Sequence, residues 1–211
     1  MAVPIRITIA DDHALFRQGL RLLLDLEPEV EVVAEVHRAA DLGATVRSVP
    51  SDLLLLDLQM ERWSFADIEP LSKVVGIIVL TASERTEDAL HAIRLGARAV
   101  VQKRFASETL MEAIRAAAEG HVWLPPALQA EIAKQWREPE SKTLSPRERE
   151  IARLVALGLH NAEIAKKLFI SEVTVKTHLN NVFQKLSLRD RVGLVRYAIR
   201  VGPIDVHEHE P

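Results

Sequence analysis

Apolar residues in the first 120 positions form short runs, separated by stretches with helical spacing. The runs are rich in valine, isoleucine and leucine, and they predict strands at 5–10, 30–36, 53–56, 74–80 and 99–102. The stretches between them predict helices at 14–26, 38–46, 67–71, 87–95 and 108–119. The third of these helices is short because Pro70 interrupts it, and Ser107 is the expected N-cap of the last. Five repeats of strand and helix predict an α/β fold with a doubly wound, five-stranded parallel sheet.

The second half of the chain shows helical periodicity without strand-like runs. It predicts a helix after Pro126 and further helices at 146–157, 162–168, 172–186 and 190–201. Side chains that can cap a helix precede or open the last four, and they are Ser145, Asn161, Ser171 and Asp190. These four helices predict an all-α helix-turn-helix domain. The expected organisation is a sheet domain at 1–120, a linker with a helix at 121–141, the helical domain at 142–202 and a disordered tail at 203–211.

Polar side chains follow the predicted strands at their carboxyl ends. The run of four leucines ends at Asp57, the first strand ends at Asp11 and Asp12, and the last two strands end at Thr81 and Lys103. A single such aspartate would be explained as a polar residue that ends a strand. If the strand order is 2-1-3-4-5, however, the first and third strands are neighbours at the switch point of the sheet. The three aspartates should then converge in one crevice, with the threonine and the lysine on its far side.

Three neighbouring carboxylates repel one another unless a cation neutralises them. An all-oxygen site with few protein ligands suits Mg²⁺ together with a phosphoryl group. A carboxylate beside Mg²⁺ can act as a nucleophile and form an aspartyl phosphate. The hydroxyl of Thr81 and the ammonium of Lys103 can bind the phosphoryl oxygens. The crevice therefore predicts the formation of an aspartyl phosphate, with Mg²⁺ as the cofactor.

The predicted helix 172–186 has one apolar and one polar face. Its apolar residues recur at spacings of four, three and four and should face the core, and they are Val175, Leu179, Val182 and Leu186. The opposite face is polar and basic without a single acid, and it carries Lys176, Thr177, Asn180, Asn181, Gln184 and Lys185. A solvated helix face usually mixes both signs of charge. The composition of this face therefore favours a recognition helix that contacts base edges in the major groove of double-stranded DNA.

Charge is distributed unevenly along the chain. Residues 1–120 hold 13 basic and 19 acidic side chains, whereas residues 142–202 hold 12 basic and 5 acidic ones, within a net charge of −3. The basic half is thus the candidate for binding nucleic acid. The chain has no cysteine, which excludes disulfides and cysteine-ligated zinc. No apolar run is long enough to span a membrane and no signal peptide is evident, so we expect a soluble, cytoplasmic protein.

The residues at the strand ends give positions 5–120 a resemblance to the receiver domain of response regulators. Asp11 and Asp12 stand where that family has its acidic pair, and Asp57, Thr81 and Lys103 stand where it has its phosphoacceptor, switch hydroxyl and lysine. The resemblance implies that a sensor histidine kinase transfers a phosphoryl group to Asp57. It also implies that Mg²⁺ is bound by this aspartate, by one member of the acidic pair (Asp12 is favoured) and by the backbone carbonyl of Gln59.

Two further sets of motifs narrow the resemblance. Asp11-Asp12-His13 with Arg17-Gln18-Gly19-Leu20 resembles the NarL/FixJ subgroup of response regulators. Positions 144–201 resemble the LuxR-type DNA-binding domain through the motifs Ser145-Pro146-Arg147-Glu148, Ile164-Ala165 and Thr174-Val175-Lys176-Thr177-His178. This second resemblance implies base contacts from Lys176, Thr177 and Asn180, and dimerisation through the last helix.

The sequence departs from the receiver pattern at three places. Glu61 stands where the family usually has a proline, and Ser64-Phe65 occupies the place of an Asp-Gly turn. The segment between the phosphoacceptor and Thr81 is several residues short, which predicts a reduced third helix. Val100 stands where the family usually has a tyrosine or phenylalanine that turns inward, and a valine cannot act as that rotating ring. These changes leave the phosphorylation chemistry in place and predict a weak response to it.

The sequence therefore predicts a two-domain transcription regulator of the NarL/FixJ type, controlled by phosphorylation and dimeric on DNA, and not an enzyme. One alternative is a regulator that binds DNA independently of phosphorylation, because Val100 and the altered segment 61–69 interrupt the response. A second alternative is a Mg²⁺-dependent phosphohydrolase with an aspartate nucleophile. The helix-turn-helix pattern and the lack of an obvious general base argue against that enzyme.

Overall fold

The computed structural model describes residues 3–135 and 144–201. It divides into two compact units, Met1–Pro125 and Pro126–Pro211. The predicted tail at 203–211 and positions 136–141 of the predicted linker lie outside the described residues. The predicted domain limits stay predictions, and each unit is described by itself. Among the described helices, none combines the length and the apolar character that crossing a membrane requires.

The first unit contains a parallel sheet of five strands in the order β2-β1-β3-β4-β5. The strands are β1 (Ile5–Ala10), β2 (Val30–Val36), β3 (Leu53–Asp57), β4 (Gly76–Thr81) and β5 (Ala99–Gln102). Every residue of β3 and β4 is buried, as expected of strands that are covered on both faces. The predicted α/β fold and its strand order are confirmed, and β1 lies beside β3.

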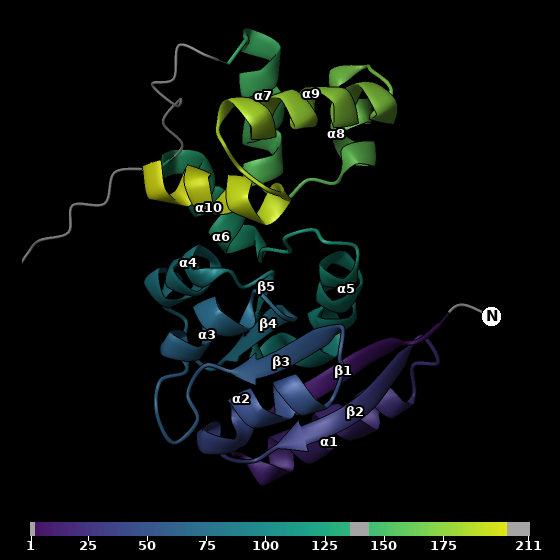
Figure 1. Ribbon diagram of the computed structural model, residues 1–211, viewed down its shortest axis with the longest axis vertical. Coiled ribbons are helices and arrows are strands. Elements are labelled where there is room, and N and C mark those ends of the chain that lie inside the picture. Colours follow the sequence, from purple (N-terminus) through teal and green to yellow (C-terminus); the bar gives the residue numbers. More distant parts are fainter. Residues whose placement is uncertain (1–2, 136–143, 202–211) are drawn as a thin grey trace, which may run out of the picture. The chain divides into compact units, whose positions relative to one another are not determined.

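Helices cover both faces of this sheet (Figure 1). They are α1 (Ala14–Asp25), α2 (Ala39–Ser48), α3 (Phe65–Leu71), α4 (Thr86–Leu95) and α5 (Ala106–Ala118). One core cluster joins Leu20 and Leu24 of α1 to Leu110 and Ile114 of α5 through alternate residues of the strands. Because side chains alternate between the faces of a strand, the intervening residues face the layer of α2, α3 and α4. Val100 belongs to that second layer, because its neighbours Ala99 and Val101 belong to the first cluster.

Several predicted boundaries in the first unit differ from the observed ones by one or two residues, and the differences at β4 and α5 have a clear cause. The strand β4 begins at Gly76 and not at position 74, because Val74 and Val75 still turn back onto Leu71 through backbone hydrogen bonds of 2.9 and 3.0 Å. Ser107 is not an N-cap. The 3₁₀ turn η1 (Lys103–Phe105) leads directly into α5, so Ser107 already lies inside the helix. Pro70 lies inside α3, which is short, as predicted.

The second unit contains α6 (Pro126–Gln135), α7 (Pro146–Ala156), α8 (Asn161–Leu168), α9 (Glu172–Lys185) and α10 (Arg191–Val201). The last four form the predicted helical domain, in which α7 contacts α8, α9 and α10. Ser145 and Ser171 cap α7 and α9 as predicted, with side-chain oxygens that accept the Glu148 and Thr174 amides. Asn161 is the first residue of α8 and not its cap, because His160 occupies that position.

Candidate functional site

The phosphoacceptor predicted from the sequence lies at the carboxyl end of the central strand. Asp57 is the last residue of β3, and its side chain is 1% exposed. Its Oδ1 accepts a hydrogen bond of 3.0 Å from the backbone amide of Gln59. Its Oδ2 accepts one of 2.8 Å from Nζ of Lys103, which follows β5. A buried carboxylate held from two sides in this way is fixed in orientation at the edge where parallel strands bind ligands.

The acidic pair lies beside this aspartate because β1 pairs with β3. Asp11 is fully buried and its Oδ2 lies 2.8 Å from Nζ of Lys103, which therefore bridges Asp11 and Asp57. Asp12 is partly exposed, and one oxygen of each of the three carboxylates lies within 4.8 Å of the others. Three carboxylates against one ammonium leave a net negative charge in the crevice. All of these ligand atoms are oxygens, and their negative charge is only partly neutralised by the lysine. Both features suit a hard divalent cation such as Mg²⁺.

Three residues at the start of α1 also contribute to this crevice, and no role had been predicted for them. His13 Nδ1 lies 2.9 Å from Asp12 Oδ1 and 3.6 Å from Asp57 Oδ2. The ring of Phe16 lies 4.7 Å from Nζ of Lys103, a cation–π contact. Arg17 donates a hydrogen bond of 2.6 Å to the backbone carbonyl that follows β1. His13 and Arg17 belong to the motif that resembles the NarL/FixJ subgroup, whereas the only sequence signal of Phe16 is that it follows the acidic pair closely.

The predicted switch hydroxyl ends the neighbouring strand. Thr81 is the last residue of β4, one position beyond Leu80, which pairs with Asp57. It is 3% exposed, and its Oγ1 accepts a hydrogen bond of 3.0 Å from the amide of Ser83. The hydroxyl of Ser83 in turn donates to Asp88 of α4 at 2.6 Å. Two hydrogen bonds therefore connect Thr81 to the start of α4.

The segment that departs from the receiver pattern is held by specific contacts. Glu61 Oε2 accepts the first backbone amide of α2, that of Ala39, at 2.8 Å, so the residue that replaces the family's proline caps a helix. The rings of Trp63 and Phe65 stack at 5.4 Å, and Phe65 meets His91 of α4 edge-on at 4.6 Å. These contacts join the segment after Asp57 to α2 and α4.

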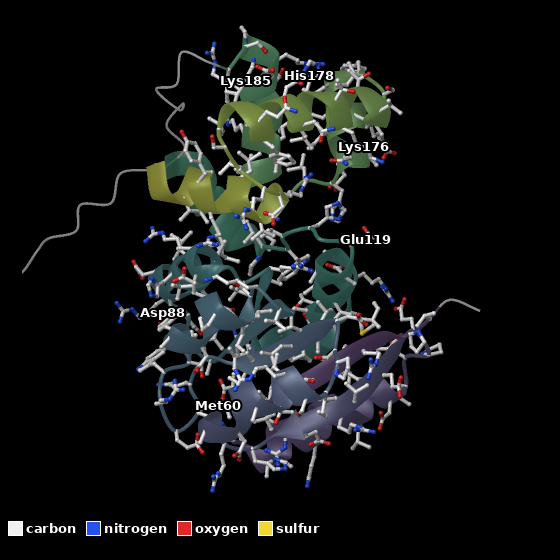
Figure 2. The ribbon with its side chains drawn as sticks, viewed as in Figure 1. Met60, Asp88, Glu119, Lys176, His178 and Lys185 are labelled. Carbon is white, nitrogen blue, oxygen red and sulfur yellow. The ribbon has the colours of Figure 1, made fainter. Side chains whose placement is uncertain are left out.

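In the second unit, the predicted recognition helix α9 buries Val175, Leu179 and Val182, and Leu186 at its end is half-buried. The residues proposed to contact DNA are all exposed, and they are Lys176, Thr177, Asn180, Asn181 and Lys185. Figure 2 shows Lys176 in the first half of α9 and Lys185 at its end. Val173, one turn before Lys176 and Thr177, is 73% exposed, and the sequence had not singled it out. An exposed apolar group at this place suits contact with a thymine methyl group.

Lys185 differs from the other exposed residues of this face. Its Nζ donates to both carboxylate oxygens of Glu148 on α7, at 2.7 and 3.0 Å. Glu148 is 4% exposed and also accepts the Ser145 amide at 2.7 Å, which completes the capping box. Hydrogen bonds from Lys185 and from the Ser145 amide lower the pKa of the Glu148 carboxyl. Lys185 therefore ties α9 to α7 within the domain.

A second buried charged side chain, Arg191, connects α10 to α8 and to the loop before it. Arg191 at the start of α10 is 8% exposed and donates to Asn161 Oδ1 at 3.0 Å and to the carbonyl of Leu159. Burial lowers the pKa of Arg191 to about 10, so the guanidinium remains charged at neutral pH. Asn161, predicted as a helix cap, thus serves as an acceptor that joins α8 to α10.

Two family descriptions match this chain. Residues 7–115 match the response regulator receiver domain, and residues 142–198 match the bacterial regulatory proteins of the luxR family. The nitrate/nitrite response regulator protein NarP of Escherichia coli (strain K12) is 36% identical over 200 residues, covering 91% of this chain and 93% of NarP. The uncharacterized transcriptional regulatory protein YxjL of Bacillus subtilis (strain 168) is 35% identical over 210 residues, covering 94% and 96%.

Solved structures of RcsB give the same result in three dimensions. The RcsB response regulator of Salmonella typhimurium is 27% identical, with a TM-score of 0.57 over 94% of this chain and 99% of that chain. Another RcsB structure, also 27% identical with a TM-score of 0.57, contains two RcsB dimers bound to two parallel DNAs and covers 94% of this chain and 100% of that chain. The matches therefore extend over both units and not only over one of them.

Proposed function

Because this chain belongs to the response regulators with a LuxR-type DNA-binding domain, we propose that a sensor histidine kinase phosphorylates it on Asp57 and that it then controls transcription as a dimer on DNA. The observation that carries the proposal is Asp57 itself, buried at the end of β3 between the acidic pair and Lys103. Such a regulator works in the compartment that holds the chromosome, which is the cytoplasm in bacteria. Its family regulates transcription and is not a family of enzymes.

The residues of the crevice have distinct tasks in phosphoryl transfer. A carboxylate oxygen of Asp57 attacks the phosphorus of the donor, and the bond to the donor's histidine nitrogen breaks with its electron pair. Lys103 and the Thr81 hydroxyl bind the phosphoryl oxygens that carry the transferred charge. Asp12, Asp57 and the Gln59 carbonyl, with Asp11 behind them, would hold Mg²⁺. The ion would supply positive charge against the phosphoryl oxygens.

Chelation of divalent cations should stop labelling of the chain by acetyl phosphate. Asp12→Ala should also weaken Mg²⁺ binding by at least about tenfold, because it removes a direct ligand. Titration of tryptophan fluorescence with MgCl₂ measures this binding without any phospho-donor, since Trp63 lies close to the site in sequence. Asp41→Ala is a matched control, because Asp41 is an exposed carboxylate on α2. Labelling that continues unchanged in excess EDTA would contradict this site.

Lys176→Ala should weaken binding to the operator by about 1–3 kcal/mol and relax sequence preference if Lys176 contacts a base. Lys176 is exposed on the outer face of α9, and the hydroxyl of neighbouring Thr177 is already bonded to the Val173 carbonyl at 3.0 Å. Fluorescence anisotropy on operator and on random DNA separates the two effects. Lys73→Ala removes an exposed lysine from the first unit and is the control. An equal loss on both DNAs would mean that Lys176 contacts only phosphate.

Binding of the full chain to its operator, with and without beryllofluoride, tests the proposed function. We expect tighter binding in the phosphorylated-like state, but by less than about tenfold, or about 1.4 kcal/mol. A ligand shifts an equilibrium only by its differential affinity for the two states, and Val100 is a small, fully packed side chain that offers little change in packing. An unchanged affinity would favour the alternative of regulation without phosphorylation. A hundredfold gain would show that another element transmits the change.

A further inference from the structure

The segment that follows Asp57 is a closed turn. The Ser64 amide donates a hydrogen bond of 3.0 Å to the Leu58 carbonyl. Between these two residues, Gln59 and Trp63 lie opposite each other in an isolated antiparallel bridge. Gln59 is the residue whose amide is bonded to Asp57 Oδ1 and whose carbonyl is the proposed ligand of Mg²⁺. The position of Trp63 is therefore tied to that of a residue at the phosphorylation site.

Three aromatic rings connect this turn to α4. The ring of Trp63 is stacked on that of Phe65, with an angle of 6° between the two planes. Phe65 in turn meets His91 of α4 edge-on, at an angle of 69°. Offset stacking and edge-to-face contact are the arrangements that aromatic rings favour. We refer to Trp63, Phe65 and His91 as the aromatic cluster.

The shape of the turn depends on side-chain contacts. Residues 58–64 include neither glycine nor proline, the residues that most often shape a turn through their own backbone preferences. Glu61 joins the turn to α2 by accepting the Ala39 amide, and Arg62 pairs with Asp67 of α3 at 2.7 Å. The aromatic cluster supplies the connection to α4. Trp63 is 46% exposed, so its ring serves to hold the turn more than to fill the core.

We propose that Trp63 and Phe65 are positioning residues for the metal site, which hold Gln59 in place beside Asp57. They act through the backbone of the turn, because Gln59 and Trp63 are paired across it. Residues that orient a metal ligand without binding the ion can change metal affinity by about tenfold or more. The inference rests on the proposed function, since it concerns the same Mg²⁺ and the same phosphoacceptor.

Binding of Mn²⁺ to the full chain tests this role without a phospho-donor. Mn²⁺ favours the same oxygen ligands as Mg²⁺, and electron paramagnetic resonance measures the free ion. Trp63→Ala should raise the dissociation constant of Mn²⁺ about tenfold, because the turn loses its connection to α4. Trp63→Phe keeps a ring over Phe65 and should bind nearly as tightly as the wild-type chain. His91→Ala removes the other end of the cluster and should weaken binding in the same direction.

Phe169→Ala is the matched control, because it removes a ring that is 94% exposed in the second unit. It should leave the dissociation constant of Mn²⁺ unchanged. Unchanged binding in Trp63→Ala would overturn the proposal. Equal losses in Trp63→Ala and Trp63→Phe would also overturn it, since the second variant retains the stacked pair.

Hydrogen exchange of the Gln59 amide gives a readout without any metal. In Trp63→Ala this amide should exchange several-fold faster, because its bond to Asp57 Oδ1 is held less firmly. The amides of β4 should keep their wild-type rates, which shows that the variant remains folded. A Gln59 amide that exchanges at the wild-type rate in Trp63→Ala would contradict the positioning role.

Phospho-labelling by acetyl phosphate at two concentrations of MgCl₂ separates this inference from the proposed function. Because the aromatic cluster acts on metal affinity, Trp63→Ala should be labelled slowly at low MgCl₂ and should approach the wild-type rate at high MgCl₂. A defect that excess MgCl₂ does not reduce would contradict the inference. A wild-type chain that is labelled at neither concentration would refute the proposed function, whereas the Mn²⁺ constants would still decide whether the cluster positions the site.

Discussion

Asp57→Asn should abolish labelling of the chain by acetyl phosphate, whereas Asp52→Asn should leave it unchanged. An amide has no anionic oxygen to attack phosphorus, but it keeps the size of the carboxylate and can still accept the Gln59 amide. Asp52 precedes β3, and its Oδ2 accepts the Arg6 amide at 2.8 Å. It lies about 16 Å from Asp57 along the strand, at the wrong edge of the sheet.

Intact-mass spectrometry after incubation with acetyl phosphate and Mg²⁺ measures this difference. The wild-type chain and Asp52→Asn should each gain one phosphoryl group, and Asp57→Asn should gain none. Thermal melting of the three proteins shows whether the loss comes from unfolding. Lys103 keeps its contact of 2.8 Å with Asp11 in the variant, so we expect the fold to persist. If Asp57→Asn still gains a phosphoryl group, the phosphoacceptor must be another residue.

The sequence predicts the crevice well because its members lie at strand ends. A strand buried on both faces is apolar throughout, so its last polar residue marks the edge of the sheet, as Asp57 does. Once β1 is placed beside β3, Asp11 must lie near Asp57. Periodicity and chain order are enough for both inferences. The same reasoning cannot find Phe16, whose contact with Lys103 depends on the rotamers of two side chains from distant elements.

Side-chain contacts between two different helices could not be predicted from the sequence, for a related reason. Helical periodicity shows that Lys185 shares a face with Lys176, and this led to its assignment to the DNA surface. It does not show that α7 brings Glu148, 37 residues away, within 2.7 Å. Similarly, Glu61 departs from the family pattern in sequence, and only the structure shows that it caps α2 across 22 residues. Such pairings depend on how one helix packs against another. The hydrophobic pattern of a single helix carries no information about that packing.

The Glu148–Lys185 pair should contribute strongly to the stability of the DNA-binding unit. Glu148→Ala should lower the free energy of unfolding of α7 and α9 by about 2–3 kcal/mol, because it removes a buried acceptor of three hydrogen bonds, two from Lys185 and one from the Ser145 amide. Glu150→Ala is the matched control on the same helix, since Glu150 forms an exposed pair with Arg147 at 2.8 Å. Exposed pairs contribute about 0–1 kcal/mol. Hydrogen exchange of amides in α7 and α9 at neutral pH measures both variants.

The contribution of Glu148 to the free energy of unfolding should also depend on pH. The direction of this dependence follows from the shift of its pKa. Hydrogen bonds from Lys185 and the Ser145 amide lower the pKa of Glu148 in the folded chain. Its contribution is therefore complete above the ordinary pKa of a glutamate, about 4.3, and is lost as the pH falls through the lower folded value. Urea unfolding of the wild-type chain and of Glu148→Ala should accordingly differ most near pH 7 and converge in acid. A difference that stays unchanged from neutral pH into acid would show that packing and not charge makes Glu148 important.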